Sequence, residues 1–368
     1  MICQPEVILA RLQVREGPAE KRRVAKLNHR PLQVVSLFSG CGGMDFGFMS
    51  AGFEPILAID VNEAACRSYS LNLPLVRILR RDLASAPHGY VTERLHELPT
   101  RATPVGVIGG PPCQAFSRGN GHKRIDDPRA DLPRAYAGVL RELNKEFEVD
   151  FFVFENVLGL RHGRHDVQFR EFKDLFTDAG FRIFEGELNA LDFGVPQVRR
   201  RVFVVGFNRR KYRTLEFTFP ARRVSKPRCV GDFLEELPEP TFFRRGLEPE
   251  EIAFHPNHWC MNPRSPRFKN GSLHNSKIHG RPFRLLKWDA PSWTVAYGHR
   301  EMHVHPSGKR RVSIFEAMLL QGFPEKYQLY GTLSDQVRQV SDAVPPPLAR
   351  GLARAIRKVL GYDDAKQS

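Results

Sequence analysis

The sequence predicts an α/β fold built on a mostly parallel, doubly wound sheet. From Leu32 onward, short apolar runs alternate with turns and helical stretches, as expected for strands that are buried on both faces. Polar residues capable of chemistry follow several of these runs at equivalent positions. After Phe207 the chain becomes rich in Pro, Arg, His and Asn up to about His305, which indicates a smaller, irregular domain.

Six apolar runs are the predicted strands, and the third of them is the weakest. They cover residues 34–38, 56–59, 76–79, 105–108, 150–154 and 201–205. Helices are predicted over residues 44–50, 312–320 and 347–360, the last because leucine and isoleucine recur there at helical spacing. Residues 1–30 are polar and basic and contain one candidate helix, residues 6–14.

The composition favours a polyanionic partner. The 368 residues include 56 Lys and Arg against 41 Asp and Glu, which gives a formal net charge of +15. Neutralisation of phosphates drives nonspecific binding to nucleic acid, so this surplus suits such a partner. A basic protein need not bind a polyanion, but here the basic residues form clusters, as at 199–201, 209–211 and 309–311.

The cysteines and the N-terminal region indicate a reducing compartment. Six cysteines are scattered without the spacing of a disulfide framework. Residues 1–30 lack an apolar core of signal-peptide length, and no stretch approaches a membrane span. We expect a cytoplasmic protein, or a nuclear one in a eukaryote, with no membrane partner.

A glycine turn follows the first predicted strand and opens a helix. Gly40 and Gly42 stand within residues 38–43, where the backbone can approach a ligand closely. Such turns are also common packing devices. The third glycine of the dinucleotide-binding spacing is absent, since Asp45 stands in its place, so a nicotinamide oxidoreductase is disfavoured.

Two carboxylates follow the next two strands. Asp60 comes directly after the second predicted strand, and Asp82 comes shortly after the third. Ligands of open α/β sheets bind at this carboxyl edge. We therefore expect Asp60 to accept both hydroxyls of a ribose, and Asp82 to accept from an adenine amino group.

A cysteine, a glutamate and two arginines form a second group of candidates. Cys113 follows the fourth predicted strand within Gly-Gly-Pro-Pro-Cys-Gln, a rigid turn that exposes a thiol at the rim of the sheet. Glu155 follows the fifth strand, and Arg199 and Arg201 stand two apart, so they should point to one face. Each residue alone has an ordinary explanation, as a core cysteine, a solvated acid or surface arginines. Together they supply the thiol, acid and guanidinium groups needed to attack a pyrimidine ring.

This set resembles the C5-cytosine DNA methyltransferases of bacterial restriction-modification systems, from about Val34 to about Ile356. The resemblance implies a Rossmann-like domain that uses S-adenosylmethionine, with an inserted target-recognition domain. It divides the chain into a basic N-terminal extension (1–30), a catalytic and cofactor domain (31–207), a target-recognition domain (208–305) and a return to the catalytic domain (306–368).

The resemblance also implies roles for individual residues. Cys113 would attack C6 of a flipped-out cytosine, Glu155 would share a proton with N3, and Arg199 or Arg201 would hold O2. Phe38 would pack on the adenine of the cofactor, Gly40 and Gly42 would border its methionine moiety, and Leu132 would line its pocket. The implied DNA-recognition residues are Gln197, Thr294 and Val295.

Several points stay open on the sequence alone. The last family motif usually carries Gly-Asn, whereas this chain has Ser341-Asp342, which changes the hydrogen-bonding character at a cofactor contact. Histidines 255, 258, 274 and 279 are interpreted as loop residues and DNA contacts in preference to a metal site, so no metal is predicted. The expected partner is duplex DNA, which in a bacterium means association with the nucleoid, and the expected state is a monomer. The enzyme would act either beside a cognate restriction endonuclease, as a functional and not necessarily physical partner, or as a solitary relative of such systems. A tRNA cytosine-5 methyltransferase and a catalytically inactive DNA-binding regulator are the alternatives.

Overall fold

The computed structural model describes residues 31–112, 131–161, 163–222, 224–268, 283–294 and 302–362. The N-terminal extension, including the helix predicted over residues 6–14, lies outside these ranges. So does Cys113. The four-domain division proposed from the sequence remains a prediction.

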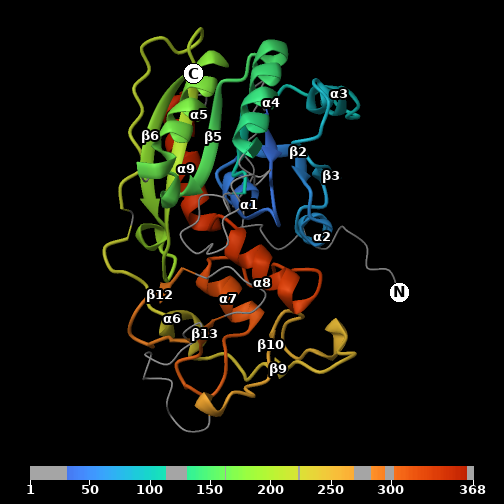
Figure 1. Ribbon diagram of the computed structural model, residues 1–368, viewed down its shortest axis with the longest axis vertical. Coiled ribbons are helices and arrows are strands. Elements are labelled where there is room, and N and C mark those ends of the chain that lie inside the picture. Colours follow the sequence, from blue (N-terminus) through green and yellow to red (C-terminus); the bar gives the residue numbers. More distant parts are fainter. Residues whose placement is uncertain are drawn as a thin grey trace, which may run out of the picture. The chain divides into compact units, whose positions relative to one another are not determined.

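A seven-stranded sheet with the order β3-β2-β1-β4-β5-β8-β6 organises the first two thirds of the chain (Figure 1). Neighbouring strands pair in parallel except β8, which runs antiparallel to both β5 and β6. The strands are β1 (Gln33–Leu37), β2 (Glu54–Asp60), β3 (Arg77–Arg80), β4 (Gly106–Gly109), β5 (Phe151–Val157), β6 (Phe181–Asn189) and β8 (Arg200–Asn208). The mostly parallel sheet expected from the sequence is confirmed.

All six predicted runs lie in or overlap strands of this sheet, whereas β6 was not predicted. Its residues are mostly half-buried, and charged Arg182, Glu185 and Glu187 interrupt the apolar pattern. β6 lies at the edge of the sheet and pairs only with β8 in it. Because an edge strand is less buried than a central one, its sequence does not need to be continuously apolar.

Helices cover both faces of the sheet. The helices are α1 (Gly43–Met49), α2 (Glu63–Asn72), α3 (Tyr90–His96), α4 (Leu132–Phe147), α5 (Asp166–Asp178), α6 (Gly231–Leu234), α7 (Ile314–Leu320), α8 (Leu333–Asp342) and α9 (Pro346–Val359). Alternate residues of each central strand enter two different cores, as the period of a strand requires. In β5, Phe152 and Phe154 pack with α4 and α5, while Phe151 and Val153 pack with α1 and α9.

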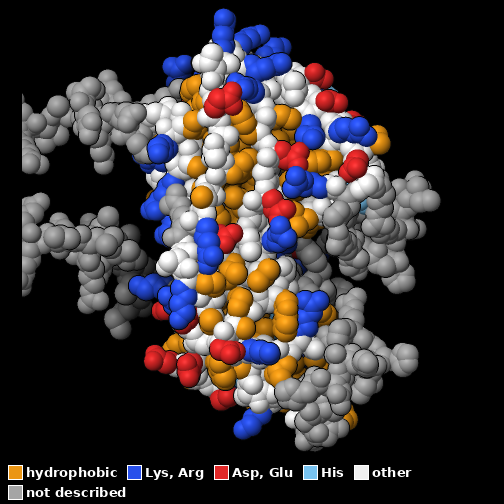
Figure 2. Space-filling view, turned by 90° about the vertical axis from the view of Figure 1, so that its left-hand side faces the viewer, with side chains coloured by type: hydrophobic (Ala, Val, Ile, Leu, Met, Phe, Trp, Pro, Cys, Tyr) orange, Lys and Arg blue, Asp and Glu red, His pale blue; other side chains and the backbone are white. Residues whose placement is uncertain are grey.

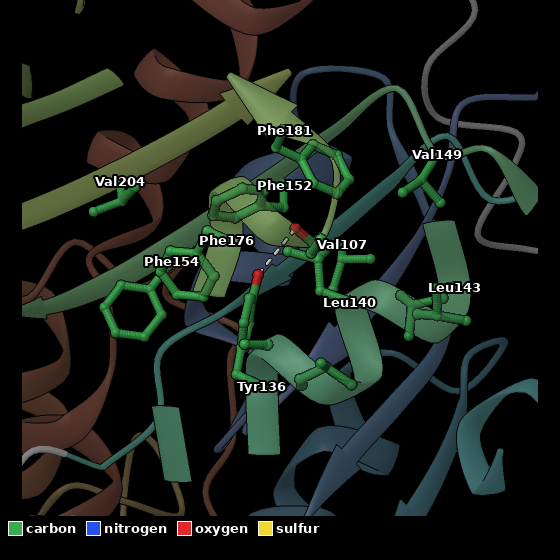
Figure 3. Packing of buried hydrophobic residues seen from close by; sticks show 14 of the residues in the cluster. Val107, Tyr136, Leu140, Leu143, Val149, Phe152, Phe154, Phe176, Phe181 and Val204 are labelled. Carbon is green, nitrogen blue, oxygen red and sulfur yellow. Dashed lines mark hydrogen bonds between the residues drawn. The ribbon is translucent and has the colours of Figure 1, made fainter. Parts of the chain in front are cut away.

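Aromatic rings fill much of the core beneath α4 and α5 (Figure 3). Tyr136 of α4 is fully buried, and its ring contacts Phe152, Phe154 and Phe176 edge to face at centroid distances of 5.6–6.2 Å. Its hydroxyl donates to the carbonyl of Val153 at 2.8 Å, and the carbonyl of Val107 lies 3.3 Å away. These bonds satisfy the polar tip of the ring, so a buried tyrosine ties α4 to two central strands.

α1 and α9 pack closely on the opposite face. Gly47 lies in α1, where an added Cβ would stand 2.5 Å from Cβ of Ala349 and 2.6 Å from the carbonyl oxygen of Pro346. The absence of a side chain at this position lets the two helices approach. The C-terminal helix predicted from leucine and isoleucine spacing therefore completes the core that begins with β1.

Beyond Asn208 the described chain has short elements and a core of its own. The short strands there are β9 (Thr241–Phe242), β10 (Trp259–Cys260), β11 (Arg284–Leu285), β12 (Ser292–Trp293) and β13 (His303–Val304), and one more, β7 (Gln197–Val198), lies just before β8. A third cluster of buried apolar residues joins α6, α7 and α8. β12 pairs with β7, which ties this region to the segment just before β8.

The surface carries the expected surplus of basic residues. On the face shown in Figure 2, which lies on the β6 side of the sheet, Lys and Arg side chains occur along the whole height. Within the described ranges, no helix combines the length and the apolar character needed to cross a bilayer.

Candidate active site

A cavity of about 450 Å³ opens at the carboxyl ends of the central strands. This volume is in the range of pockets that enclose a small molecule or cofactor. Its wall combines the turn after β1, the end of β2, the loop after β3, the end of β4, the start of α4, part of β5, and the end of α8. The lining includes seven residues predicted for the site, namely Phe38, Gly40, Asp60, Asp82, Leu132, Glu155 and Arg201.

Asp60 organises the glycine turn at one end of the cavity. Its two carboxylate oxygens each accept a backbone N–H at 2.8 Å, from Gly40 and from Asn62. Burial raises the pKa of Asp60, and these hydrogen bonds act against that rise. Gly40 has a φ of +56°, and a Cβ built on it would meet no atom within 4 Å. The turn therefore leaves open space beside a fixed carboxylate.

Phe38 also adopts a left-handed backbone conformation, with a φ of 55°. A non-glycine residue in this region carries strain on the order of 1–3 kcal/mol, which tends to persist at functional sites. Asp82 is exposed and accepts from the backbone N–H of Ala84 at 3.0 Å, while Leu132 at the start of α4 is nearly buried. All three residues line the cavity.

Gly42 does not line the cavity, and its predicted place beside the methionine moiety stays a prediction. It is the N-cap of α1 with a φ of 90°, and a Cβ there would stand 2.9 Å from the hydroxyl oxygen of Tyr327. Tyr327 is fully buried, and its hydroxyl donates to the carbonyl of Cys41. Gly42 therefore leaves room for the side chain of Tyr327, which stabilises the turn through its hydrogen bond to Cys41.

Glu155 and Arg201 form an ion pair at the other end of the cavity. Nε of Arg201 lies 3.1 Å from Oε1 of Glu155, and the two side chains are only 7% and 10% exposed. The antiparallel pairing of β5 and β8 brings them together, since Val157 of β5 lies opposite Arg201. Burial raises the pKa of Glu155, and the positive charges of Arg201 and Arg199 act in the opposite direction. Glu155 is thus an acid that can hold a proton more readily than an exposed glutamate.

The charge of Arg199, like that of Arg201, lowers the pKa of Glu155, and the expectation that the two arginines share a face stays a prediction. The Arg199 side chain is fully buried and donates from Nη2 to the carbonyl of Ser341 at 2.8 Å. Arg199 lies between β7 and β8 and, unlike Arg201, is not part of the cavity wall. It links the sheet to the end of α8.

The segment leading to Cys113 is positioned by a residue that the sequence did not single out. The side-chain amide of Asn156 donates to the carbonyl of Pro111 at 3.3 Å, and both Pro111 and Pro112 line the cavity. Cys113 itself is outside the described residues. The only sequence signal for Asn156 was its place next to Glu155 in a predicted strand end.

The residues predicted to read DNA have different environments. Gln197 is fully buried, and its side-chain amide donates to the carbonyl of Leu320 at 3.1 Å. It cannot touch DNA in this conformation, so that prediction is corrected to a packing role against α7. Thr294 is half-buried and donates from its hydroxyl to the carbonyl of Val198 at 2.7 Å. Val295 is outside the described residues.

Two of the four histidines expected to contact DNA also serve the core. His255 stacks on Phe315 with the ring centroids 4.2 Å apart, and burial lowers its pKa to about 4. His258 is buried, with Nδ1 3.0 Å from the hydroxyl of Ser313, which caps α7. Both orient α7, and the expectation that they contact DNA is wrong. His274 and His279 are outside the described ranges.

Two further carboxylates line the cavity: Asp342, which the sequence places at a cofactor contact, and Asp45, to which the sequence gave no role in the site. Asp45 in α1 is fully buried, with the hydroxyl of Tyr69 donating to Oδ1 at 2.8 Å, and burial raises its pKa to about 6. Asp342 is the last residue of α8, and burial in the cavity wall raises its pKa to about 6 as well. The cavity is therefore richer in acid groups than the motifs alone indicate.

Curated relatives resemble the chain over nearly its whole length. The type II methyltransferase M.MthTI of Methanothermobacter thermautotrophicus is 31% identical over 351 residues, covering 89% of this chain and 98% of the relative. The type II methyltransferase M1.HphI of Haemophilus parahaemolyticus is 32% identical over 344 residues, covering 89% of this chain and 87% of the relative.

Solved structures share the fold. A DNA modification methyltransferase encoded within an E. coli prophage superposes with a TM-score of 0.71 at 21% identity, covering 90% of this chain and 99% of its own. The S. pombe Dnmt2 methyltransferase gives a TM-score of 0.62 at 18% identity, covering 91% of this chain and 100% of its own. A model of the C-5 cytosine-specific DNA methylases matches residues 32–358. The chain therefore belongs to the C-5 cytosine-specific DNA methylase family.

Proposed function

We propose that this protein transfers a methyl group from S-adenosylmethionine to C5 of a cytosine within a specific duplex DNA sequence. The proposal rests on one observation, namely that a single cavity is lined both by residues suited to binding the cofactor and by residues suited to binding the cytosine. Asp60 and the open glycine turn lie at one end, and the Glu155–Arg201 pair lies at the other. Family membership indicates the reaction, methyl transfer to C5 of cytosine. The two groups of residues are the candidate binding sites for the cofactor and for the cytosine.

The residues at the first end fit S-adenosylmethionine. Asp60 has fixed oxygens that can accept from ribose hydroxyls, Phe38 offers an aromatic side chain, and the open space at Gly40 admits a ligand close to the backbone. Asp82 is exposed at the cavity wall, where its carboxylate can accept from an adenine amino group. The cofactor supplies an electrophilic methyl group.

The second end suits a cytosine whose ring must be activated. C5 of cytosine is a weak nucleophile, and addition of the Cys113 thiolate to C6 would place electron density on C5. Glu155 would hold a proton at N3, because burial favours its protonated form, and Arg201 would bind O2. After transfer, a base removes the C5 proton, the C5–C6 double bond forms again, and the bond to Cys113 breaks.

A base inside a duplex cannot reach a cavity of this kind, so the cytosine must be flipped out. The net charge of +15 supports binding to the phosphate backbone. The relatives are named type II methyltransferases, which supports a role as the modification enzyme beside a cognate restriction endonuclease. We place the protein with DNA in the bacterial cytoplasm and expect it to act as a monomer.

The test is transfer of labelled methyl groups from S-adenosylmethionine to genomic duplex DNA, with total tRNA as the parallel substrate and the product mapped base by base. Label at C5 of cytosine in one short DNA sequence is the expected result. Label only in tRNA would overturn the DNA substrate.

Cys113→Ala should abolish transfer and keep DNA binding. Absence of label with the wild-type protein, together with DNA binding, would favour a noncatalytic regulator.

A further inference from the structure

We propose that Asp342 makes the cavity selective for the positively charged methyl donor over its neutral product. The inference rests on the proposed function, since it concerns how the same cavity treats S-adenosylmethionine and S-adenosylhomocysteine. These two molecules differ by one methyl group and by the positive charge on sulfur. A carboxylate close to the sulfur would therefore distinguish them.

Asp342 lies in the cavity wall and is accessible. It is the last residue of α8, its side chain is 43% exposed, and Nε of Arg338, one helical turn earlier, lies 3.9 Å from its carboxylate. Arg338 is itself 54% exposed, so the pair is open to solvent and weak. The carboxylate therefore remains able to interact with a ligand in the cavity.

Asp342 lines the same cavity as Asp60 and Arg201. Asp60, at the cofactor end, is near enough to raise the pKa of Asp342, and Arg201, at the base end, is near enough to lower it. Methyl transfer requires the donor sulfur to lie between the ribose and C5 of the base. If the ribose binds at Asp60 and the cytosine at Arg201, the sulfur lies inside the cavity that Asp342 lines.

The charge state of Asp342 suits this role at neutral pH. Burial raises its pKa to about 6, Arg338, Arg199 and Arg201 lower that pKa, and Asp60 raises it. The charge of Asp342 in turn raises the pKa of the buried Cys41 thiol, which packs behind the glycine turn. Asp342 is therefore mostly ionised at pH 7 and mostly neutral at pH 5.

This role depends on the departure from the usual family residue. Asparagine at this position offers the same shape and a dipole but no charge. A carboxylate near a sulfonium in a partly solvated cavity changes the binding constant by roughly tenfold, whereas it has little effect on a neutral thioether. The consequence for the enzyme is weaker product retention relative to donor binding.

Isothermal titration calorimetry with S-adenosylmethionine and with S-adenosylhomocysteine tests the proposal on the full chain. Asp342→Asn should lower the affinity for the donor by roughly tenfold and change the affinity for the product by less than about twofold. The matched control is Asp82→Asn, the same change at the adenine end, which should weaken both ligands equally. Equal effects of Asp342→Asn on both ligands, or no effect on either, would overturn the selective role.

A pH series on the wild-type protein gives a second measurement that needs no substitution. The ratio of donor to product affinity should fall between about pH 7 and pH 5, and Asp342→Asn should remove most of that fall. A wild-type ratio independent of pH would count against Asp342. Failure of the wild-type protein to bind either ligand would instead overturn the cofactor assignment on which the inference rests.

Discussion

Nε of Arg201 lies 3.1 Å from Oε1 of Glu155 in a nearly buried pair that closes one end of the cavity. Burial of Glu155 away from water favours its protonated form and raises its pKa, while the charge of the Arg201 guanidinium favours the carboxylate and lowers that pKa. These opposing effects leave an acid whose proton can be shared with a ring nitrogen. The pair also fixes the guanidinium, which then presents its remaining N–H groups in a defined direction.

Glu155→Gln should reduce the rate of methyl transfer by about 10²- to 10⁴-fold, because glutamine can donate a hydrogen bond but cannot share a proton. Burial raises the pKa of Glu155, so its protonated fraction falls as the pH rises through that pKa. The wild-type single-turnover rate should therefore decline on the alkaline side, and the Gln variant should lose that part of the pH profile. A variant with the wild-type rate would remove Glu155 from the chemistry.

Asp60→Ala should weaken the binding of S-adenosylmethionine, since it removes the predicted ribose acceptor and frees the backbone N–H groups of Gly40 and Asn62. The loss of a charged hydrogen-bond acceptor corresponds to roughly 1.5–3 kcal/mol, or about ten- to a hundredfold in affinity. Calorimetry measures the change directly, and thermal unfolding checks that the variant is folded. Unaltered affinity in a folded variant would show that Asp60 only shapes the turn.

Asp45→Asn should stabilise the protein at neutral pH. The pKa of Asp45 is raised from 3.8 to about 6 by burial, so the folded protein loses stability as the pH rises between these two values. A shift of about two pKa units corresponds to about 3 kcal/mol. Asparagine keeps an acceptor for the Tyr69 hydroxyl and has no charge to bury. The gap in melting temperature between the variant and the wild type should widen from about pH 4 to about pH 6 and stay nearly constant above that. A gap that does not widen would show that Asp45 is not the titrating group.

Gly47→Ala should destabilise the protein by about 1–3 kcal/mol, because the new methyl group would stand 2.5 Å from Cβ of Ala349 and force α1 away from α9. Gly138→Ala is the matched control within α4, where an added Cβ meets no atom within 4 Å. That change should stabilise by about 0.5–1 kcal/mol through helix propensity. Thermal melting of both variants tests the packing, and equal melting temperatures would contradict it.

Much of the candidate site follows from local sequence. An apolar run ended by a turn predicts a buried strand, and residues at the carboxyl ends of parallel strands must share one edge of the sheet. Phe38, Gly40, Asp60, Asp82 and Glu155 follow this rule, and the structure places all five in one cavity wall. Their convergence required no knowledge of distant contacts beyond the parallel arrangement of the strands.

The tertiary structure decided which polar side chains face the cavity and which are buried elsewhere. Arg199 bonds to Ser341, 142 residues away, and Gln197 bonds to Leu320, 123 residues away. Local pattern cannot reveal such partners, because a polar side chain is buried only where a distant group satisfies it.

The sequence by itself therefore determined the family, the sheet and the main site residues, all of which depend on short-range patterns and motifs. Only the tertiary structure paired Arg201 with Glu155, bonded the buried Arg199 and Gln197 side chains to distant carbonyl groups, and brought Asp45 to the cavity. The physical reason is that strand and turn formation depend on neighbours in the chain. The burial and charge state of a polar group depend on every element packed around it.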